Sequence, residues 1–203
     1  MVRRRFITTL LGLLLLSFCA VACPQNSTPA QLNESGQVVV EGRATPYLIH
    51  HLPVSSFPQL PVSIQDRLTH RGCLIPQTYE AHQPENVVHA SLEYHGSSDW
   101  AVLCSVDGTV SLLVFFSNSG GDPMVLASAP ETERLQSHGS GNVLGFNWGI
   151  DPASPERVHE AQTGLPRRPP PPDHDALEDS TIDHRAVFHL YAKGRWTLVD
   201  LPE

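Results

Sequence analysis

Long apolar runs in the middle of the chain predict strands that are buried on both faces. Residues 100–104 (WAVLC) and 109–116 (TVSLLVFF) are almost continuously hydrophobic, which is typical of such strands. The dipeptide Asp107-Gly108 between them is a strong signal for a tight hairpin turn. Further strands are expected over 87–92 and 124–126. The centre of the chain is therefore predicted to be an antiparallel meander.

Two short helices are expected on either side of this meander. Pro61 suits a first helical turn, Ile64 and Leu68 are spaced to share one face, and Gly72 supplies the stop. A second helix is expected within 154–164, which starts with a Ser-Pro pair and ends in glycine.

The outer segments add shorter elements. A brief strand is expected at 38–40, and the prolines between 46 and 61 are expected to exclude regular structure for some fifteen residues. Another strand is expected over 144–150, and 186–201 is expected to form a closing hairpin. The proline-rich tract 166–172 is expected to cross the surface in an extended form. The predicted fold class is α+β, mainly β, with a central antiparallel meander and two short flanking helices in a single domain.

The first 22 residues have the layout of a cleaved export signal. Arg3, Arg4 and Arg5 precede an apolar run over 6–18, and small residues follow at 20–22. A membrane-spanning anchor is the alternative, but such a helix needs roughly 20 apolar residues, and this segment is shorter and interrupted by hydroxyl side chains. The three arginines also resemble a twin-arginine export motif, so the sequence leaves open which export route is used.

Cys23 follows the predicted cut, and its surroundings resemble the lipobox of bacterial lipoproteins. That resemblance implies acylation of Cys23 and attachment to the membrane; an ordinary cut would leave Cys23 as the free first residue. Residues 23–36 are expected to form a polar tether, and residues 37–203 the single globular domain. The expected location is the periplasm or cell envelope as a lipoprotein, with a soluble periplasmic or secreted protein as the alternative.

The net charge of the chain limits the kinds of molecule that it can be expected to bind. The chain carries a formal net charge of −8, and loss of a signal with three arginines and no acids lowers it to −11. An acidic protein of this kind has no electrostatic basis for binding nucleic acid. Membrane contact would depend on lipidated Cys23 alone, and the sequence identifies no ligand or protein partner.

Cys73 and Cys104 are expected to form a disulfide, because two cysteines in an oxidising compartment most simply pair. The alternative is a thiol nucleophile or a metal ligand.

The segment 91–102 resembles the calcium loop of FG-GAP-type β-repeats. Glu93, Gly96 and Asp99 stand where that loop needs an acid, a glycine and a final acid, whereas Ser91 and His95 replace expected acids. Calcium prefers six to eight oxygen ligands, so two carboxylates predict at most a weak Ca²⁺ site beside the simpler interpretation as a turn.

A second group of candidate metal ligands follows the proline tract. It comprises Asp173, His174 and Asp175, together with His184, and would suit Zn²⁺ if the side chains converged; otherwise this is a solvated acidic loop. The adjacent His50 and His51 would point to opposite faces of a strand and cannot easily share a metal.

Catalytic signatures are weak. The sequence has no Gly-x-Ser-x-Gly elbow, phosphate loop or dinucleotide fingerprint. The neighbouring carboxylates Glu131 and Glu133 are too generic to assign acid–base roles.

Two stretches together, 71–77 (RGCLIPQ) and 99–105 (DWAVLCS), resemble a group of uncharacterised exported bacterial proteins. The likeness supports export and the pairing of Cys73 with Cys104, and implies no activity. The leading hypothesis is a non-catalytic binding or envelope-associated module. The alternatives are an exported metal-dependent or hydrolytic enzyme, and a weak calcium-binding adhesion-like module.

Overall fold

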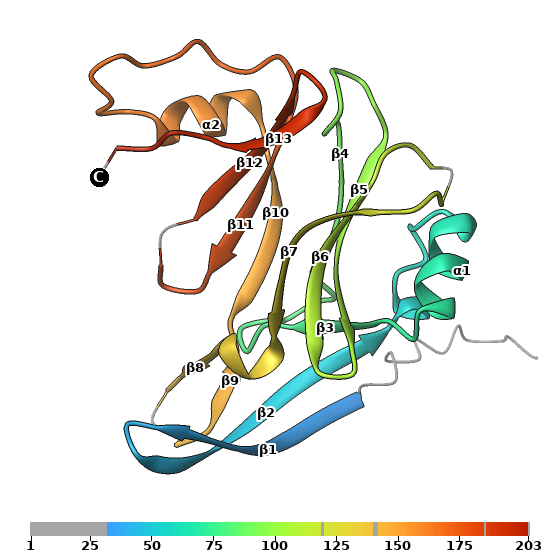
Figure 1. Ribbon diagram of the computed structural model, residues 1–203, viewed down its shortest axis with the longest axis vertical. Helices are drawn as coiled ribbons and strands as arrows, with labels where there is room; N and C mark the ends of the chain where they lie inside the picture. Colours follow the sequence, from blue (N-terminus) through green and yellow to red (C-terminus); the bar gives the residue numbers. More distant parts are fainter. Residues whose placement is uncertain (1–31, 119, 140–141, 185, 203) are drawn as a thin grey trace, which may run out of the picture.

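Two β-sheets and two short α-helices make up the fold (Figure 1). The computed structural model describes residues 32–118, 120–139, 142–184 and 186–202. Within these ranges, one sheet has nine strands in the order β7-β6-β5-β3-β2-β9-β8, with β1 paired to β2 and β4 paired to β5. The other sheet has four strands in the order β10-β11-β12-β13.

The elements have the following bounds. The strands of the large sheet are β1 (Leu32–Val40), β2 (Arg43–Pro53), β3 (Leu74–Gln77), β4 (Val87–Ala90), β5 (Asp99–Val106), β6 (Thr109–Phe115), β7 (Met124–Pro130), β8 (Leu135–Ser137) and β9 (Leu144–Phe146). The small sheet holds β10 (Trp148–Ala153), β11 (Ala176–Thr181), β12 (Val187–Ala192) and β13 (Arg195–Leu198). The helices are α1 (Val62–His70), α2 (Pro155–Ala161) and the 3-10 turns η1 (Val54–Ser56) and η2 (Glu131–Glu133). The predicted mainly-β α+β class is confirmed.

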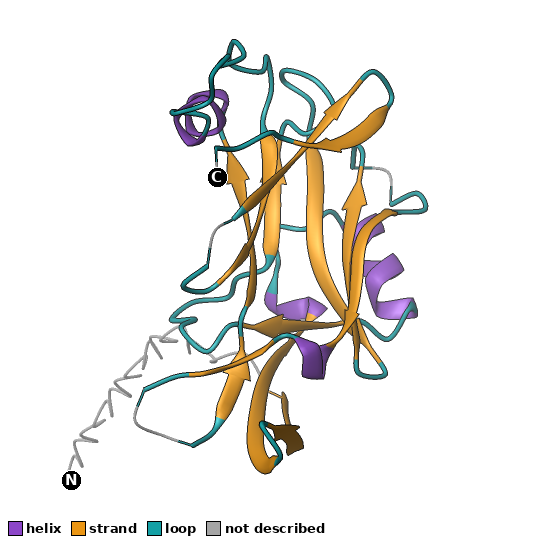
Figure 2. Cartoon of the chain, turned by 60° about the vertical axis from the view of Figure 1, so that its left-hand side comes forward, coloured by secondary structure: helices purple, strands orange, loops and turns teal. Residues whose placement is uncertain are grey.

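The meander β4-β5-β6-β7 is confirmed, and β5 is its most buried strand. Alternate residues of β5 pack into two different cores: Val102 into the core beneath α1, and Leu103 into the core between the two sheets. Figure 2 shows the same strands between the small sheet and α1. This explains why the run is continuously apolar rather than alternating. Asp107 and Gly108 form the predicted turn, both with positive φ.

Helix α1 and the disulfide close one of these cores. Ile64 and Leu68 are fully buried, as their spacing predicts. Beyond Gly72, whose φ is +73°, the chain reaches Cys73, which pairs with Cys104 of β5 at a Cα–Cα distance of 5.3 Å. The disulfide therefore fastens the end of α1 to the central strand.

The N-terminal hairpin differs from the prediction in two respects. Strand β1 begins at Leu32, so residues 32–36 belong to the sheet rather than to a polar tether. Strand β2 runs through Pro46, where regular structure was not expected. Pro46 lies opposite Gln37, three pairs along from the hydrogen-bonded pair Val40–Arg43 that closes the hairpin. Because hydrogen-bonded and non-hydrogen-bonded pairs alternate, Pro46 falls in a non-hydrogen-bonded pair, and its missing N–H removes no bond to β1.

The C-terminal half follows the predicted pattern with one correction. Ser154 caps α2, and its hydroxyl accepts a hydrogen bond from the amide of Arg157. The closing hairpin forms as β12 and β13. The single strand predicted over 144–150 is wrong: Asn147 separates β9 in the large sheet from β10 in the small one. The tract 166–172 contains no strand or helix and is mostly exposed.

Candidate functional site

Asp99, one of the two acids in the predicted calcium loop, is fully buried and holds a turn together. Its Oδ2 accepts hydrogen bonds from the amides of Leu92 (2.9 Å) and Glu93 (2.8 Å) and from the Ser97 hydroxyl. Its Oδ1 accepts from the amide of Ser117 at 2.9 Å. With both oxygens occupied by protein donors, Asp99 is arranged as a structural acceptor. The geometry therefore favours the interpretation of this segment as a turn.

The four residues of the second predicted metal group do not converge, although two of them contact each other. His174 contacts Asp173 through Nδ1 (2.6 Å) and the carbonyl of Tyr191 through Nε2 (2.8 Å). The hydrogen bond to His174 lowers the pKa of Asp173. Asp175 accepts from a backbone amide in the loop after β4, and His184 lies exposed at the end of β11. Among the described residues these four form no common ligand group.

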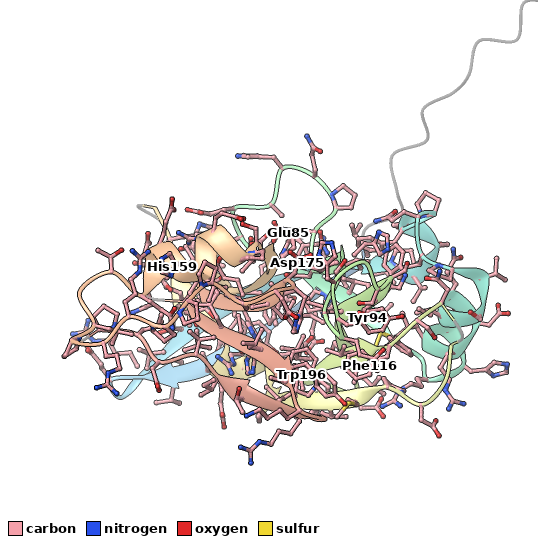
Figure 3. All side chains as sticks on the ribbon, turned by 90° about the horizontal axis from the view of Figure 1, so that it is seen from above. Glu85, Tyr94, Phe116, His159, Asp175 and Trp196 are labelled. Atoms are coloured by element: carbon pink, nitrogen blue, oxygen red, sulfur yellow. A yellow bond between two sulfur atoms is a disulfide. The ribbon has the colours of Figure 1, made fainter. Side chains whose placement is uncertain are left out.

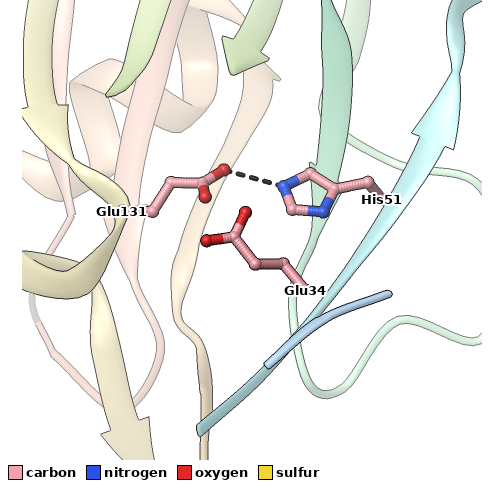
Figure 4. A group of neighbouring side chains, drawn as sticks. All are labelled: Glu34, His51 and Glu131. Carbon is pink, nitrogen blue, oxygen red and sulfur yellow. Dashed lines mark hydrogen bonds and ion pairs between the residues drawn. The ribbon is translucent and has the colours of Figure 1, made fainter. Parts of the chain in front are cut away.

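A different trio converges, formed by Glu34, His51 and Glu131 (Figure 4). One ligand atom from each lies within 4.8 Å of the other two, and among the described residues this is the only such group of three. Nε2 of His51 lies 2.7 Å from Oε1 of Glu131. Glu34 and His51 come from the β1–β2 hairpin, and Glu131 comes from η2, about 80 residues further along the chain.

The β1–β2 hairpin places two members of the trio on the same face. Glu34 lies opposite Ile49 and Leu32 opposite His51, so Glu34 and His51 are diagonal neighbours across the strand pair. His50 points the other way, and its Nδ1 bonds Oδ1 of Asn33 at 2.7 Å. The prediction that the two adjacent histidines face opposite sides is confirmed.

Glu131 is brought to this face by the end of β7. Its amide donates to the carbonyl of Gly108 at 2.9 Å, which fixes η2 against the β5–β6 turn. The side chain of Glu131 is 2% exposed and that of His51 is 3% exposed, whereas Glu34 is exposed at the rim. The site is thus a buried carboxylate–imidazole pair with a second carboxylate at its solvent side.

Burial and hydrogen bonding act on the pKa of Glu131 in opposite directions. Burial alone would raise the pKa of Glu131, but the hydrogen bond with His51, with contributions from Ser105 and Glu34, lowers it below its ordinary value. Oε2 of Glu131 is buried and has no hydrogen-bond partner within the described part of the chain. The Tyr47 hydroxyl donates weakly to Glu34 at 3.5 Å, and burial followed by the charge of Glu34 raises the pKa of Tyr47.

Imidazole nitrogen and carboxylate oxygen are the ligands that Zn²⁺ and similar divalent ions take in proteins. Sequence reasoning missed this trio because Glu34 and His51 are 17 residues apart, His51 and Glu131 are 80 residues apart, and the three belong to no motif. The adjacent histidines and the acids near Glu131 were visible, but nothing in the sequence indicates that β7 ends beside β2.

No known family model, curated protein or solved structure matches this chain. In the described ranges, neither helix is long and apolar enough to cross a bilayer.

Proposed function

We propose that this protein is an exported, non-catalytic binding protein whose ligand is a divalent transition metal ion, with Zn²⁺ the best suited. The observation that carries the proposal is Oε2 of Glu131, a buried carboxylate oxygen without a hydrogen-bond partner in the described residues, set beside His51 and Glu34. A buried polar atom without a partner is costly, and a cation between the three side chains would satisfy it.

The ligand types narrow the choice of metal. Ca²⁺ and Mg²⁺ prefer oxygen ligands alone, whereas one imidazole with two carboxylates suits Zn²⁺ and its neighbours. Metal–ligand bonds of about 2.1 Å in a tetrahedron separate ligand atoms by about 3.4 Å. The 2.7 Å contact between His51 and Glu131 is shorter. The ion would therefore replace their hydrogen bond and move the two side chains slightly apart.

Burial favours binding over catalysis. His51 and Glu131 are almost completely enclosed, so access from solvent is through the rim at Glu34. This leaves little room for an organic substrate beside the ion. Three protein ligands leave a fourth position for water, an arrangement that catalytic zinc sites also have. The enclosure of His51 and Glu131 is therefore what favours ion binding over catalysis here.

Location is a second part of the proposal. The signal-like segment and Cys23 lie outside the described residues. The Cys73–Cys104 disulfide is compatible with an extracytoplasmic compartment. Acylation of Cys23 would hold the domain at the membrane surface through residues 24–31.

The test is metal titration of the purified mature chain, after chelator treatment and dialysis. We expect one Zn²⁺ per chain by calorimetry and mass spectrometry, a rise in Tm with Zn²⁺, and no comparable response to Ca²⁺. Glu34→Gln, at the exposed rim, should fold normally and weaken Zn²⁺ binding at least about tenfold.

Matched controls are available next to two of the ligands. His50→Gln alters the neighbouring imidazole on the opposite face of β2, and Glu133→Gln alters an exposed acid of the same η2 turn. Both should keep wild-type Zn²⁺ affinity. A folded chain that binds no stoichiometric Zn²⁺, or a Glu34→Gln variant that binds like wild type, would contradict the proposed function.

A further inference from the structure

The outer edge of β1 is the most open strand edge of the N-terminal hairpin. Figure 1 shows β1 on the far side of β2 from β3 and β9. Among the described residues, β1 pairs only with β2, over all nine of its positions and without a register shift. A free edge of this length presents a row of backbone donors and acceptors to any compatible strand.

The edge lacks the features with which proteins usually block such pairing. It contains no proline, no lysine and no bulge. Three large apolar side chains are exposed on it, those of Leu32 (47%), Val39 (75%) and Val40 (42%). Its one charged residue, Glu34, is directed toward Glu131 and His51 rather than along the edge (Figure 4).

The turn of the hairpin determines which backbone groups face outward. Glu41 and Gly42 both have positive φ and join Val40 directly to Arg43, as in a two-residue hairpin turn. Val40 and Arg43 are then a hydrogen-bonded pair. Because such pairs alternate along the strand, the backbone N–H and C=O groups of residues 40, 38, 36, 34 and 32 face β2. The outward groups are those of Asn33, Ser35, Gln37 and Val39.

The outward backbone groups of β1 can form hydrogen bonds with the same groups on β1 of a second copy of the chain. Antiparallel pairing about Gly36 sets Ser35 against Gln37 and Asn33 against Val39, and each of these is a pair of outward-facing residues. The remaining pairs are Glu34 with Val38 and Leu32 with Val40. No like charges are therefore paired, and the exposed apolar residues Leu32 and Val40 contact each other across the interface. This register uses all nine residues of the strand.

We propose that β1 pairs antiparallel with β1 of a second copy of this chain, in a register centred on Gly36, so that the two large sheets become one. The interface is isologous, as in most homodimers. It does not depend on metal binding. The full chain has a net charge of −8, and loss of the three arginines of the signal leaves each mature chain at −8 − 3 = −11. Repulsion between copies should therefore make the dimer more stable at higher salt.

The first test is sedimentation of the mature chain with Cys23→Ser, which removes the lipid site, over a range of concentrations and salt. We expect a monomer–dimer equilibrium. Ser35→Pro removes an outward N–H without removing a bond to β2, and should raise the dimer dissociation constant at least about tenfold. Ser35→Ala keeps the N–H and is the matched control, with wild-type dimerisation.

The second test fixes the register by cross-linking. In the proposed pair Leu32 faces Val40 of the other copy at a non-hydrogen-bonded position, where Cα atoms are about 4.5 Å apart. Within one chain the two positions are about 26 Å apart, because they lie eight residues along one strand. The double variant Leu32→Cys with Val40→Cys should therefore oxidise to a covalent dimer, whereas neither single variant should.

Three outcomes would overturn the proposal. The first is a monomer at every concentration together with no cross-link from the double variant. The second is a dimer that Ser35→Pro leaves unchanged, which would place the interface elsewhere. The third is a Ser35→Pro variant in which the stability of the monomer falls while dimerisation is unaffected. That result would mean that this edge pairs with another segment of the same chain.

Discussion

Nε2 of His51 donates a 2.7 Å hydrogen bond to Oε1 of Glu131, although 80 residues separate the two in sequence. The contact joins β2 to η2 at the end of the meander, and both side chains are almost fully buried. A buried carboxylate that loses this hydrogen bond is left with an uncompensated charge, which is far more costly than the loss of a surface contact.

The first prediction is that His51→Ala is strongly destabilising. It strands the Glu131 carboxylate in the core, and we expect the free energy of unfolding to fall by about 3 to 5 kcal/mol. His50→Ala, which removes an exposed imidazole bonded to Asn33, should change it by less than about 1 kcal/mol. Urea unfolding of both variants measures the difference. Equal losses of unfolding free energy in the two variants would mean that the buried His51–Glu131 pair is no more stabilising than the exposed contact of His50.

The second prediction concerns acid stability. The pKa of Glu131 is lowered from its ordinary value of 4.5, so the folded state favours the ionised carboxylate. Its stabilising contribution is therefore present above pH 4.5 and lost as the pH falls through the lower folded pKa. Glu131→Gln should flatten this part of the profile of unfolding free energy against pH. Glu133→Gln, an exposed acid on the same turn, should leave that part of the profile as in wild type.

The third prediction is a stabilising substitution. Asp151 lies directly opposite Glu178 in the β10–β11 pair, and burial followed by the charges of Glu178 and Glu85 raises its pKa above 3.8. A raised carboxyl pKa means that the ionised form is disfavoured in the folded state, so the penalty is present above the folded pKa and disappears below 3.8. Asp151→Asn should therefore raise Tm at pH 7 and have no charge-related effect at pH 3. A lower Tm at pH 7 would show that the Asp151 carboxylate is stabilising.

The fourth prediction separates structure from calcium binding at Asp99. Asp99→Ala leaves the buried backbone amide of Leu92 without an acceptor and removes the shorter of the two hydrogen bonds made by the amide of Glu93, and we expect a loss of about 2 to 4 kcal/mol. Ca²⁺ should leave the Tm of the wild-type chain unchanged. Glu93→Gln, which alters the other acid of the loop, should be close to neutral. A rise in Tm with Ca²⁺ that Glu93→Gln abolishes would restore the calcium interpretation.

Much of the fold followed from local patterns. The continuous run in β5, the turn at Asp107-Gly108 and the serine cap of α2 act over a few residues, and each formed as predicted. Local patterns failed where pairing overrode them. Pro46 disfavours strands in general, but its position opposite Gln37 makes it harmless in this register, and register is not visible in a local segment.

The candidate site shows the same division more sharply. Asp99 and the acids around His174 are clustered in sequence, and the fold uses several of these side chains to bond nearby backbone groups. Glu34, His51 and Glu131 are dispersed in sequence, and the fold brings them together.

The sequence by itself determined the strand-rich character, the helix ends, the signal-like N-terminus and the pair of cysteines available to bond, because these depend on neighbouring residues and on composition. Only the tertiary structure decided that η2 ends beside β2 and that β1 lies at the rim of the large sheet. Those relationships arise from pairing between strands distant in sequence, whose register depends on how two whole sheets bury their apolar faces together.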